Sequence, residues 1–403
     1  MTFRISSVLV LLASTSLAAC SSEVLTTSAP PTQPPAEAPA DPADPPKDPP
    51  PVVKPPVVAA PTLTIDSAFA GGAGITDATN SIYAATPAPD GKILVSLRKA
   101  GGASGWGNGT IVSRYLASGA IDATFGTGGS TASKLVANPQ AIALDPQGRV
   151  LVGGSGLYDP DTTSDSGREI VVARFTPQGA LDTTYGTNGR AILNFSPANT
   201  FTTGLRVRPD GGALVAVYGR TSGKATFGIF LLGAAGTTVN AFGTNGFIPS
   251  ADPLDGALVL PDGRSLVPDN GGLWAYDTNG AAAATSFGAI PAFVAASRVG
   301  KDGSITMIRV DTKFHVDRYT ATGAKDTTFT SAVIGNDPTD LAVRDDGSVV
   351  VAVGGGLSWL PKTGGTVTEL MKSVNAGKLA MTNDGKLLVT TAADSAKVLR
   401  YTF

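Results

Sequence analysis

The residues that could carry metal chemistry are gathered in one polar segment. The stretch SGLYDPDTTSDSGRE holds Asp159, Asp161, Asp165 and Glu169 within eleven residues, and carboxylate oxygens are the ligands that calcium prefers. The segment lacks the twelve-residue spacing and the glycine position of an EF-hand. An acidic stretch rich in Ser and Thr is also an ordinary solvated loop, so a calcium site is one hypothesis and no bound cofactor is the other.

Composition excludes several other chemistries. One His and one Cys among 403 residues cannot build a multi-histidine metal site, an internal disulfide or a four-thiolate zinc site. The chain has thirty basic and thirty-two acidic residues and no basic run. The sequence therefore gives no sign of a basic surface that would bind nucleic acid. The single histidine, His315, has no adjacent Ser or Cys nucleophile, so no hydrolytic triad is visible. No Rossmann or P-loop glycine motif occurs either.

Polar insertions interrupt the apolar runs and could contact a partner. They span Lys99 to Thr110, Ser155 to Glu169 and, more briefly, Gly219 to Ala225. Trp106 stands in AGGASGWGNGT, where it could stack on a sugar or on a partner's side chain, or fold onto a neighbouring loop. The side chains in these insertions that we expect to contact a partner are Trp106, Asn108, Tyr158 and Arg168.

The first twenty residues form a secretory signal. Arg4 supplies a positive charge, an apolar stretch follows, and small residues lead to Cys20. The segment Leu17-Ala18-Ala19-Cys20 resembles the lipobox of bacterial lipoproteins. The resemblance implies that residues 1–19 are removed and that a lipid on Cys20 anchors the chain in a membrane. Ser21 after the cysteine implies the outer membrane if the envelope has two membranes. The alternatives are a soluble secreted protein or an uncleaved helix.

Residues 20–61 are expected to be a tether. Fourteen of the forty residues from Glu23 to Thr62 are proline, which favours extended conformations and prevents a packed core. The segment could instead be a ligand for proline-reading modules. The remaining residues, 62–403, are therefore predicted to hold the folded domain.

That domain is built from seven repeated units. Their landmark is a predicted two-residue turn between two apolar runs, and the glycine supplies the positive φ of such a turn. A third run with a basic or aromatic signature follows, as at Arg174-Phe175. A fourth run then often ends in Asp-x-x-aromatic-Gly. The turns are Asp90-Gly91, Gln147-Gly148, Asp210-Gly211, Asp262-Gly263, Asp302-Gly303, Asp346-Gly347 and Asp384-Gly385.

Four short runs per unit predict an all-β, seven-bladed β-propeller of four-stranded antiparallel blades. The last unit ends at AKVLRYTF without a fourth run, whereas TLTIDSAFAGG before the first unit repeats the Asp-x-x-aromatic box at Asp66 and Phe69. We therefore expect the N-terminal strand to complete the last blade and close the ring. An open solenoid is the alternative.

The boxes DPQGRVLVGG and ARFTPQGALDTTYGTNG resemble the bacterial delta-sixty repeat and, more distantly, the NHL repeat. The resemblance covers about residues 63–330. It implies a propeller fold and an extracytoplasmic location, in keeping with the signal segment. It supplies no catalytic residues.

A propeller narrows to its channel where each first strand begins. The residues expected there, within two positions, are Asn80, Gln140, Thr203, Asp255, Phe293, Asp340 and Lys378. Asp255 and Asp340 beside Lys378 could form an acid–base site, or these side chains could simply line a wet channel.

The favoured interpretation is a lipid-anchored, monomeric, non-catalytic module of the bacterial envelope. It would bind a protein or glycan through the insertions, which all fall on one face of blades one to three. One alternative is an enzyme at the channel mouth, of the metal-dependent lactonase or quinoprotein dehydrogenase type. Another is a structural envelope component, because the fold alone does not decide function.

Overall fold

The computed structural model describes residues 58–100, 109–157, 168–195, 199–250, 257–269, 272–289, 293–335, 337–391 and 396–403. Contacts divide the chain into Met1–Pro56 and Val57–Phe403, and all described residues belong to the second unit. Within these residues no helix has the length and apolarity needed to cross a membrane. Some of the residues for which the sequence predicts a role lie outside the described residues: Cys20, Trp106, Asn108, Tyr158, Asp159, Asp161, Asp165 and Asp255.

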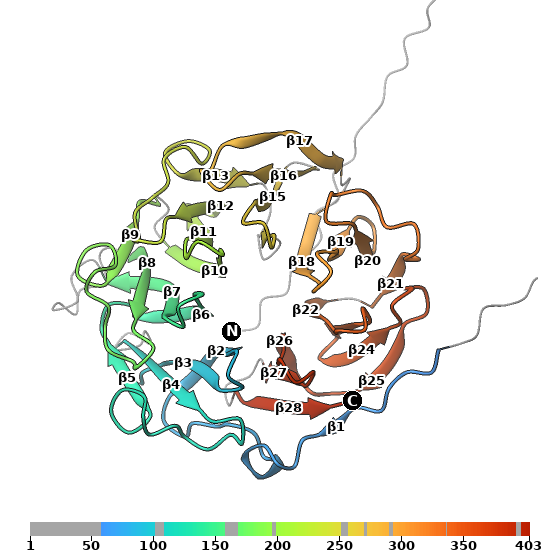
Figure 1. Cartoon of the computed structure of the whole chain (residues 1–403), viewed down its shortest axis with the longest axis horizontal. Helices are drawn as coiled ribbons and strands as arrows, with labels where there is room; N and C mark the ends of the chain where they lie inside the picture. Colours follow the sequence, from blue (N-terminus) through green and yellow to red (C-terminus); the bar gives the residue numbers. More distant parts are fainter. Residues whose placement is uncertain are drawn as a thin grey trace, which may run out of the picture. The chain divides into compact units, whose positions relative to one another are not determined.

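The second unit is a ring of seven four-stranded antiparallel sheets (Figure 1). Hydrophobic clusters lie between neighbouring sheets, as where Leu94 and Val112 of blade one meet Val150 and Val152 of blade two. The predicted propeller is confirmed. Its strands, from the inner edge outward in each blade, are β2 (Ser81–Pro87), β3 (Ile93–Arg98), β4 (Thr110–Tyr115) and β5 (Ser130–Ser133); β6 (Asn138–Leu144), β7 (Val150–Leu157), β8 (Arg168–Phe175) and β9 (Arg190–Leu193); β10 (Asn199–Val207), β11 (Ala213–Thr221), β12 (Lys224–Leu232) and β13 (Phe247–Ser250); β14 (Leu258–Val259), β15 (Ser265–Asp269), β16 (Gly272–Tyr276) and β17 (Ala282–Ala289); β18 (Phe293–Val299), β19 (Ile305–Val310), β20 (Phe314–Tyr319) and β21 (Ala332–Ile334); β22 (Pro338–Val343), β23 (Val349–Val353), β24 (Gly356–Leu360) and β25 (Thr368–Met371); and β26 (Ala376–Met381), β27 (Leu387–Thr391), β28 (Val398–Thr402) and β1 (Thr64–Ile65).

The N-terminal strand closes the ring. β1 pairs antiparallel with β28, with Thr64 opposite Thr402 and Ile65 opposite Tyr401. A short 3₁₀ turn at Ala70–Gly72 follows, and Ile75 then forms a bridge with Val398. Because the last blade takes its outer strand from the opposite end of the sequence, its closure joins the two ends of the domain.

The hairpin turns differ from the predicted two-residue form. In blade one the N–H of Ala88 bonds to the carbonyl of Lys92, and the N–H of Gly91 bonds to the carbonyl of Ala88. This is a three-residue loop in which Gly91, with φ of 81°, forms the bulge. All seven first-to-second turns repeat this pair of bonds. The predicted positive φ is therefore correct and the predicted loop length is wrong by one residue.

The predicted insertion at 219–225 is a strand extension. β11 and β12 pair without interruption up to Thr221 opposite Lys224, and Ser222 and Gly223 turn the chain with φ of 49° and 85°. Blade three is therefore elaborated by longer strands rather than by a loop.

A repeated arginine contact joins neighbouring blades. Arg114 on β4 donates from Nε to Asp122 at 2.8 Å and from Nη1 to the carbonyl of Pro177 in blade two at 2.6 Å. Its guanidinium lies 4.8 Å from the ring centroid of Phe125. The Asp-x-x-aromatic-Gly box thus lies in the connection before the outer strand β5, not at the end of the fourth strand as predicted. Its role is to hold the arginine that reaches the next blade.

The same contact recurs around the ring. Arg174 donates to Ala234, Arg318 to Lys362 and Arg400 to Ala117, in each case a carbonyl of the next blade. Leu231 replaces this arginine in blade three, and Arg208 from the preceding hairpin turn donates to Thr278 of blade four at 2.6 Å instead. Every acceptor stands two residues before a third-to-fourth turn glycine.

That turn glycine is required by close packing. At Gly179, where φ is 91°, a Cβ atom would lie 3.1 Å from the ring of Phe125 in the preceding blade. At Gly236 the same atom would lie 2.9 Å from the ring of Tyr185. The aromatic residue of the Asp-x-x-aromatic-Gly box in one blade therefore packs directly against the turn glycine of the next blade.

The contact between Arg114 and Asp122 predicts that the stability of the fold depends on pH in the acid range. Hydrogen bonding by Thr124 lowers the pKa of Asp122 to about 2; burial opposes this, and Arg114 reinforces it. Because the pKa is lower in the folded state than the usual value of about 3.9, the carboxylate stabilises the fold above about pH 4 and loses this effect as the pH falls towards 2. We expect Asp122→Asn to lower Tm at pH 7 and to approach the parent at pH 2. Thermal unfolding across this range measures it, and a difference in Tm that is independent of pH would contradict it.

Candidate functional site

The inner strands that surround the channel are irregular. Six of them shift register by one residue, at Ile82/Ala84, Pro139/Ala141, Thr202/Gly204, Val294/Ala296, Pro338/Asp340 and Ala376/Lys378. A β-bulge bends its strand and redirects side chains, and such bulges are frequent beside functional sites. Gln140 and Thr203 occupy two of the bulges. The bulges therefore set which side chains enter the channel.

A cavity of about 800 Å³ occupies the channel. Its wall comes from the inner strands of all seven blades, and its rim comes from first-to-second turns that carry Pro89, Pro146, Pro209 and Pro261. The cavity thus reaches the face that bears the hairpin turns. The insertions join second to third strands at the opposite strand ends. This volume lies within the range of small-molecule sites.

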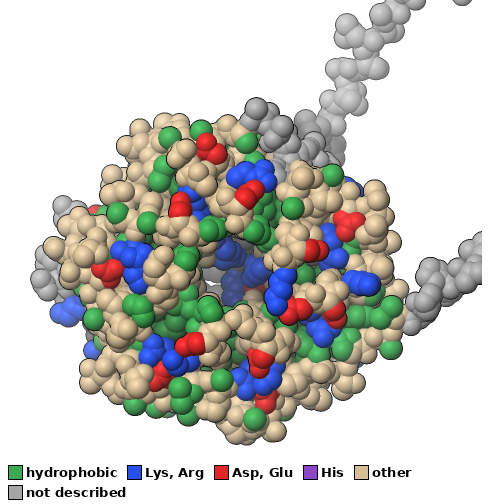
Figure 2. Space-filling view, viewed as in Figure 1, with side chains coloured by type: hydrophobic (Ala, Val, Ile, Leu, Met, Phe, Trp, Pro, Cys, Tyr) green, Lys and Arg blue, Asp and Glu red, His purple; other side chains and the backbone are tan. Residues whose placement is uncertain are grey.

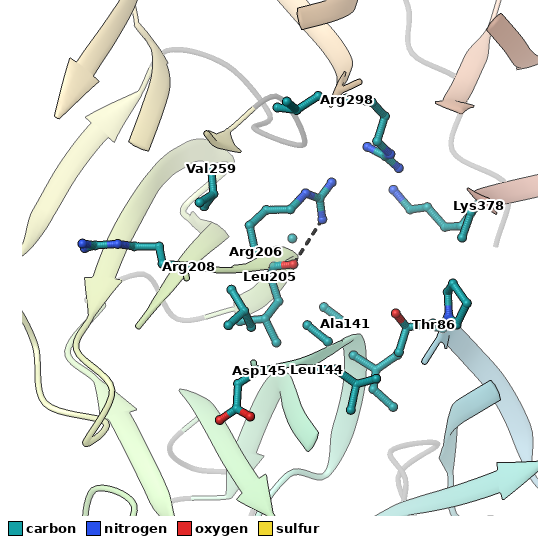
Figure 3. A pocket seen from close by; sticks show the side chains of 18 of the residues that line it. Thr86, Ala141, Leu144, Asp145, Leu205, Arg206, Arg208, Val259, Arg298 and Lys378 are labelled. Carbon is teal, nitrogen blue, oxygen red and sulfur yellow. Dashed lines mark hydrogen bonds between the residues drawn. The ribbon is translucent and has the colours of Figure 1, made fainter. Parts of the chain in front are cut away.

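Three cationic side chains converge in this cavity. Arg206 on β10, Arg298 on β18 and Lys378 on β26 come from blades three, five and seven, and Figure 3 shows their charged ends directed towards one another. Lysine and arginine side chains are visible deep in the central opening in Figure 2. Arg208 points away from the channel because its guanidinium binds Thr278 and Asp210. The channel is therefore basic at its centre.

Asp340 positions one of these cations. The residue is fully buried, and its Oδ1 lies 2.5 Å from Arg298 Nη2. Backbone N–H groups of Leu341 and Leu379 each donate to it at 2.8 Å. These contacts join blades five, six and seven. Arg298, Arg206, Lys378 and Asp340 together carry a formal charge of +2, from three cations and one carboxylate. The second acid among the described lining residues, Asp145, is paired with Arg149 at 2.5 Å.

The channel residues predicted from the sequence are only partly brought together. Gln140, Thr203, Asp340 and Lys378 line the cavity. Gln140 accepts a hydrogen bond from the N–H of Thr202, at 2.9 Å. Asn80 precedes β2. Its side-chain amide donates to the carboxylate of Asp77 and accepts a hydrogen bond from the N–H of Ala100, which follows β3. Of Phe293 only the backbone, at the start of β18, is described.

Sequence reasoning missed Arg206 and Arg298. Both stand four residues before the turn aspartate of their unit. The other units carry small or apolar side chains at that position, at Thr86, Ala143, Leu258, Ala342 and Ala380. A cation at a repeat position that is otherwise small or apolar was the signal that could have found them.

The other chemical candidates lie away from the channel. Arg168 begins β8, and only its backbone is described. Burial raises the pKa of the neighbouring Glu169, against the effect of Arg190. His315 on β20 lies 3.3 Å from Asp311. In the described part of the chain no three His, Cys, Asp or Glu side chains are grouped to hold a metal ion.

Comparisons with known proteins support the fold. A family model described as "Domain of unknown function (DUF5122) beta-propeller" matches residues 146–185, and no curated protein matches the chain. An inactive virginiamycin B lyase from Staphylococcus aureus with quinupristin is 13% identical, with 85% of this chain and 99% of that chain covered and a TM-score of 0.50. A streptogramin B lyase is 12% identical, with 82% and 95% covered and a TM-score of 0.49. At 13% identity the likeness to the virginiamycin B lyase shows the propeller fold alone.

Proposed function

We propose that this protein is a ligand-binding propeller whose channel holds a small anion with a carboxylate or phosphate group. The observation that carries this proposal is the convergence of Arg206, Arg298 and Lys378 in a cavity of about 800 Å³. Guanidinium groups bind carboxylates and phosphates in a planar, often bidentate geometry, and an ammonium adds a point charge. The charged ends of these three side chains, from three blades, are directed towards one another (Figure 3), so they can bind one anionic group together.

The charge of the channel argues against a divalent cation at the same place. Lactonase chemistry with a metal ion needs two or three oxygen ligands directed at that ion. Among the described residues of the lining, the one carboxylate directed at the basic centre is that of Asp340. It is occupied by Arg298 and two N–H groups, and the neighbouring cations repel a metal ion. The described channel residues therefore favour anion binding over metal-dependent hydrolysis.

Calorimetric titration of the folded domain with acetate and with inorganic phosphate tests the proposal. We expect saturable binding of at least one of them with Kd below about 1 mM, which corresponds to about −4 kcal/mol. Binding should weaken as ionic strength rises, because salt screens charges. The absence of heat with both anions at about 10 mM would contradict the proposal.

We also propose that a lipid on Cys20 holds the domain at the bacterial envelope. Support comes from the lipobox-like LAAC segment, the proline-rich stretch after it and the similarity of the repeats to those of secreted and surface proteins. We expect Cys20→Ser to abolish incorporation of labelled palmitate and to release the protein or leave uncleaved precursor. Equal labelling of the variant would contradict the anchor. The insertions around Trp106 and Tyr158 remain proposed contact sites for a protein or glycan partner.

A further inference from the structure

The channel is chemically asymmetric. Arg206 extends from blade three across the channel towards Arg298 and Lys378 (Figure 3). The charged ends therefore gather on the side of blades five and seven. In Figure 3 Thr86, Ala141 and Leu144 lie on the other side of the channel. A ligand in this space meets cations at one end and a different surface at the other.

That other surface is mostly carbon. Blades one and two contribute small apolar side chains and a proline to the cavity, and the rim continues with further prolines. Two of the polar side chains among them have partners, since Gln140 binds Thr202 and Asp145 binds Arg149. Thr86 adds one hydroxyl to this wall. The apolar lining residues on the inner strands of these blades are Ala84, Ala85, Pro87, Ala141, Ile142, Ala143 and Leu144.

We infer that the ligand is an amphipathic organic acid, with its carboxylate at Arg206, Arg298 and Lys378 and an apolar body against blades one and two. The inference rests on the proposed function and specifies the ligand class of that site. A fully hydrated anion such as phosphate uses the cations and gains nothing from the carbon wall. An apolar body removes water from that wall, and each added CH₂ that is buried tightens binding about three- to fourfold.

A homologous series of straight-chain carboxylates tests this inference. The folded domain is titrated with acetate, butanoate, hexanoate and octanoate, and separately with phosphate. We expect Kd to fall about three- to fourfold for each added CH₂ that the wall covers, so that octanoate binds at least about 100-fold more tightly than acetate. Phosphate is expected to bind more weakly than octanoate.

Leu144→Gln probes the wall without touching the cations. The change keeps the length of the side chain and makes it polar, so we expect octanoate to bind at least about fivefold more weakly, with acetate changed less than about twofold. Leu116→Gln is the matched control because Leu116 is an exposed leucine of blade one that does not line the cavity. Both variants are compared by Tm to confirm folding. If Leu144→Gln fails to fold, the carboxylate series alone decides.

The outcomes separate the two proposals. Equal affinity for acetate and octanoate, or tighter binding of phosphate than of octanoate, would overturn the amphipathic ligand and leave the anion site in place. Octanoate affinity that survives replacement of both Arg206 and Lys378 by Gln would show that the cations do not hold the carboxylate. That result, or the absence of binding of both acetate and phosphate, would overturn the proposed function as well.

Discussion

Deletion of residues 23–72 should destabilise the propeller by about 5 kcal/mol or more, whereas deletion of 23–57 should leave its stability nearly unchanged. The longer deletion removes β1 and Phe69, which is 1% exposed, and loss of a buried Phe alone costs about 3–5 kcal/mol. It also leaves Arg400, whose Nε lies 2.8 Å from Asp66 and which is 4% exposed, without that carboxylate, a further cost of several kcal/mol. Because folded domains are stable by about 5–15 kcal/mol, the ring should open or unfold.

Denaturant titration of the two truncated proteins measures this difference. The shorter deletion is the matched control because it removes proline-rich residues that precede the ring. Phe69→Ala in the full chain separates the packing contribution from strand loss. Equal stability of the two deletions would mean that the ring does not depend on closure through β1.

The second large effect concerns the channel. Replacement of Arg206 and Lys378 together by Gln should weaken binding of the anion at least about 100-fold. A hydrogen bond to a charged group contributes about 1.5–3 kcal/mol, so each lost cation costs about 10- to 100-fold in affinity. This pair leaves the contact between Arg298 and buried Asp340 intact, and the variant should therefore fold.

The control for this variant is Lys301→Gln. Lys301 lies in a hairpin turn, where it pairs with Asp345 at 2.6 Å and is largely exposed, and it does not line the cavity. Its loss changes net charge without changing the site. Calorimetry should show full affinity for Lys301→Gln. A similar loss of affinity in both proteins would mean that general charge, rather than the channel, attracts the anion.

The architecture could be predicted from the sequence because short motifs that determine local structure recur in each unit. The turn glycines mark the seven units, and Asp66 with Phe69 before the first unit revealed the closing strand. The signature at Arg174-Phe175 marked the third strand of a blade. What the repeats could not show was that Arg174 reaches a carbonyl of the next blade, since that contact depends on the packing of neighbouring sheets.

The channel was harder to predict for a physical reason. Bulges in the inner strands shift the alternation of side chains, so counting residues from a turn does not tell which of them face the centre. Asp340 and Lys378 line the cavity, where the sequence suggested an acidic pair with a counter-ion rather than a group of cations. The convergence of Arg206 and Arg298 with Lys378 arises only when three distant blades close into a ring. The loop hypotheses around Trp106 and Asp161 stay predictions.

Crystals of the propeller soaked with 4-bromobenzoate offer the most direct measurement, because the anomalous signal of bromine locates the ligand. We predict one strong bromine peak inside the channel, with the carboxylate within hydrogen-bond distance of Arg298 or Lys378 and the ring towards blades one and two. The peak should be absent in crystals of the variant with Gln at positions 206 and 378. A peak confined to the insertion-bearing face, or no peak in the channel at saturating ligand, would contradict the account.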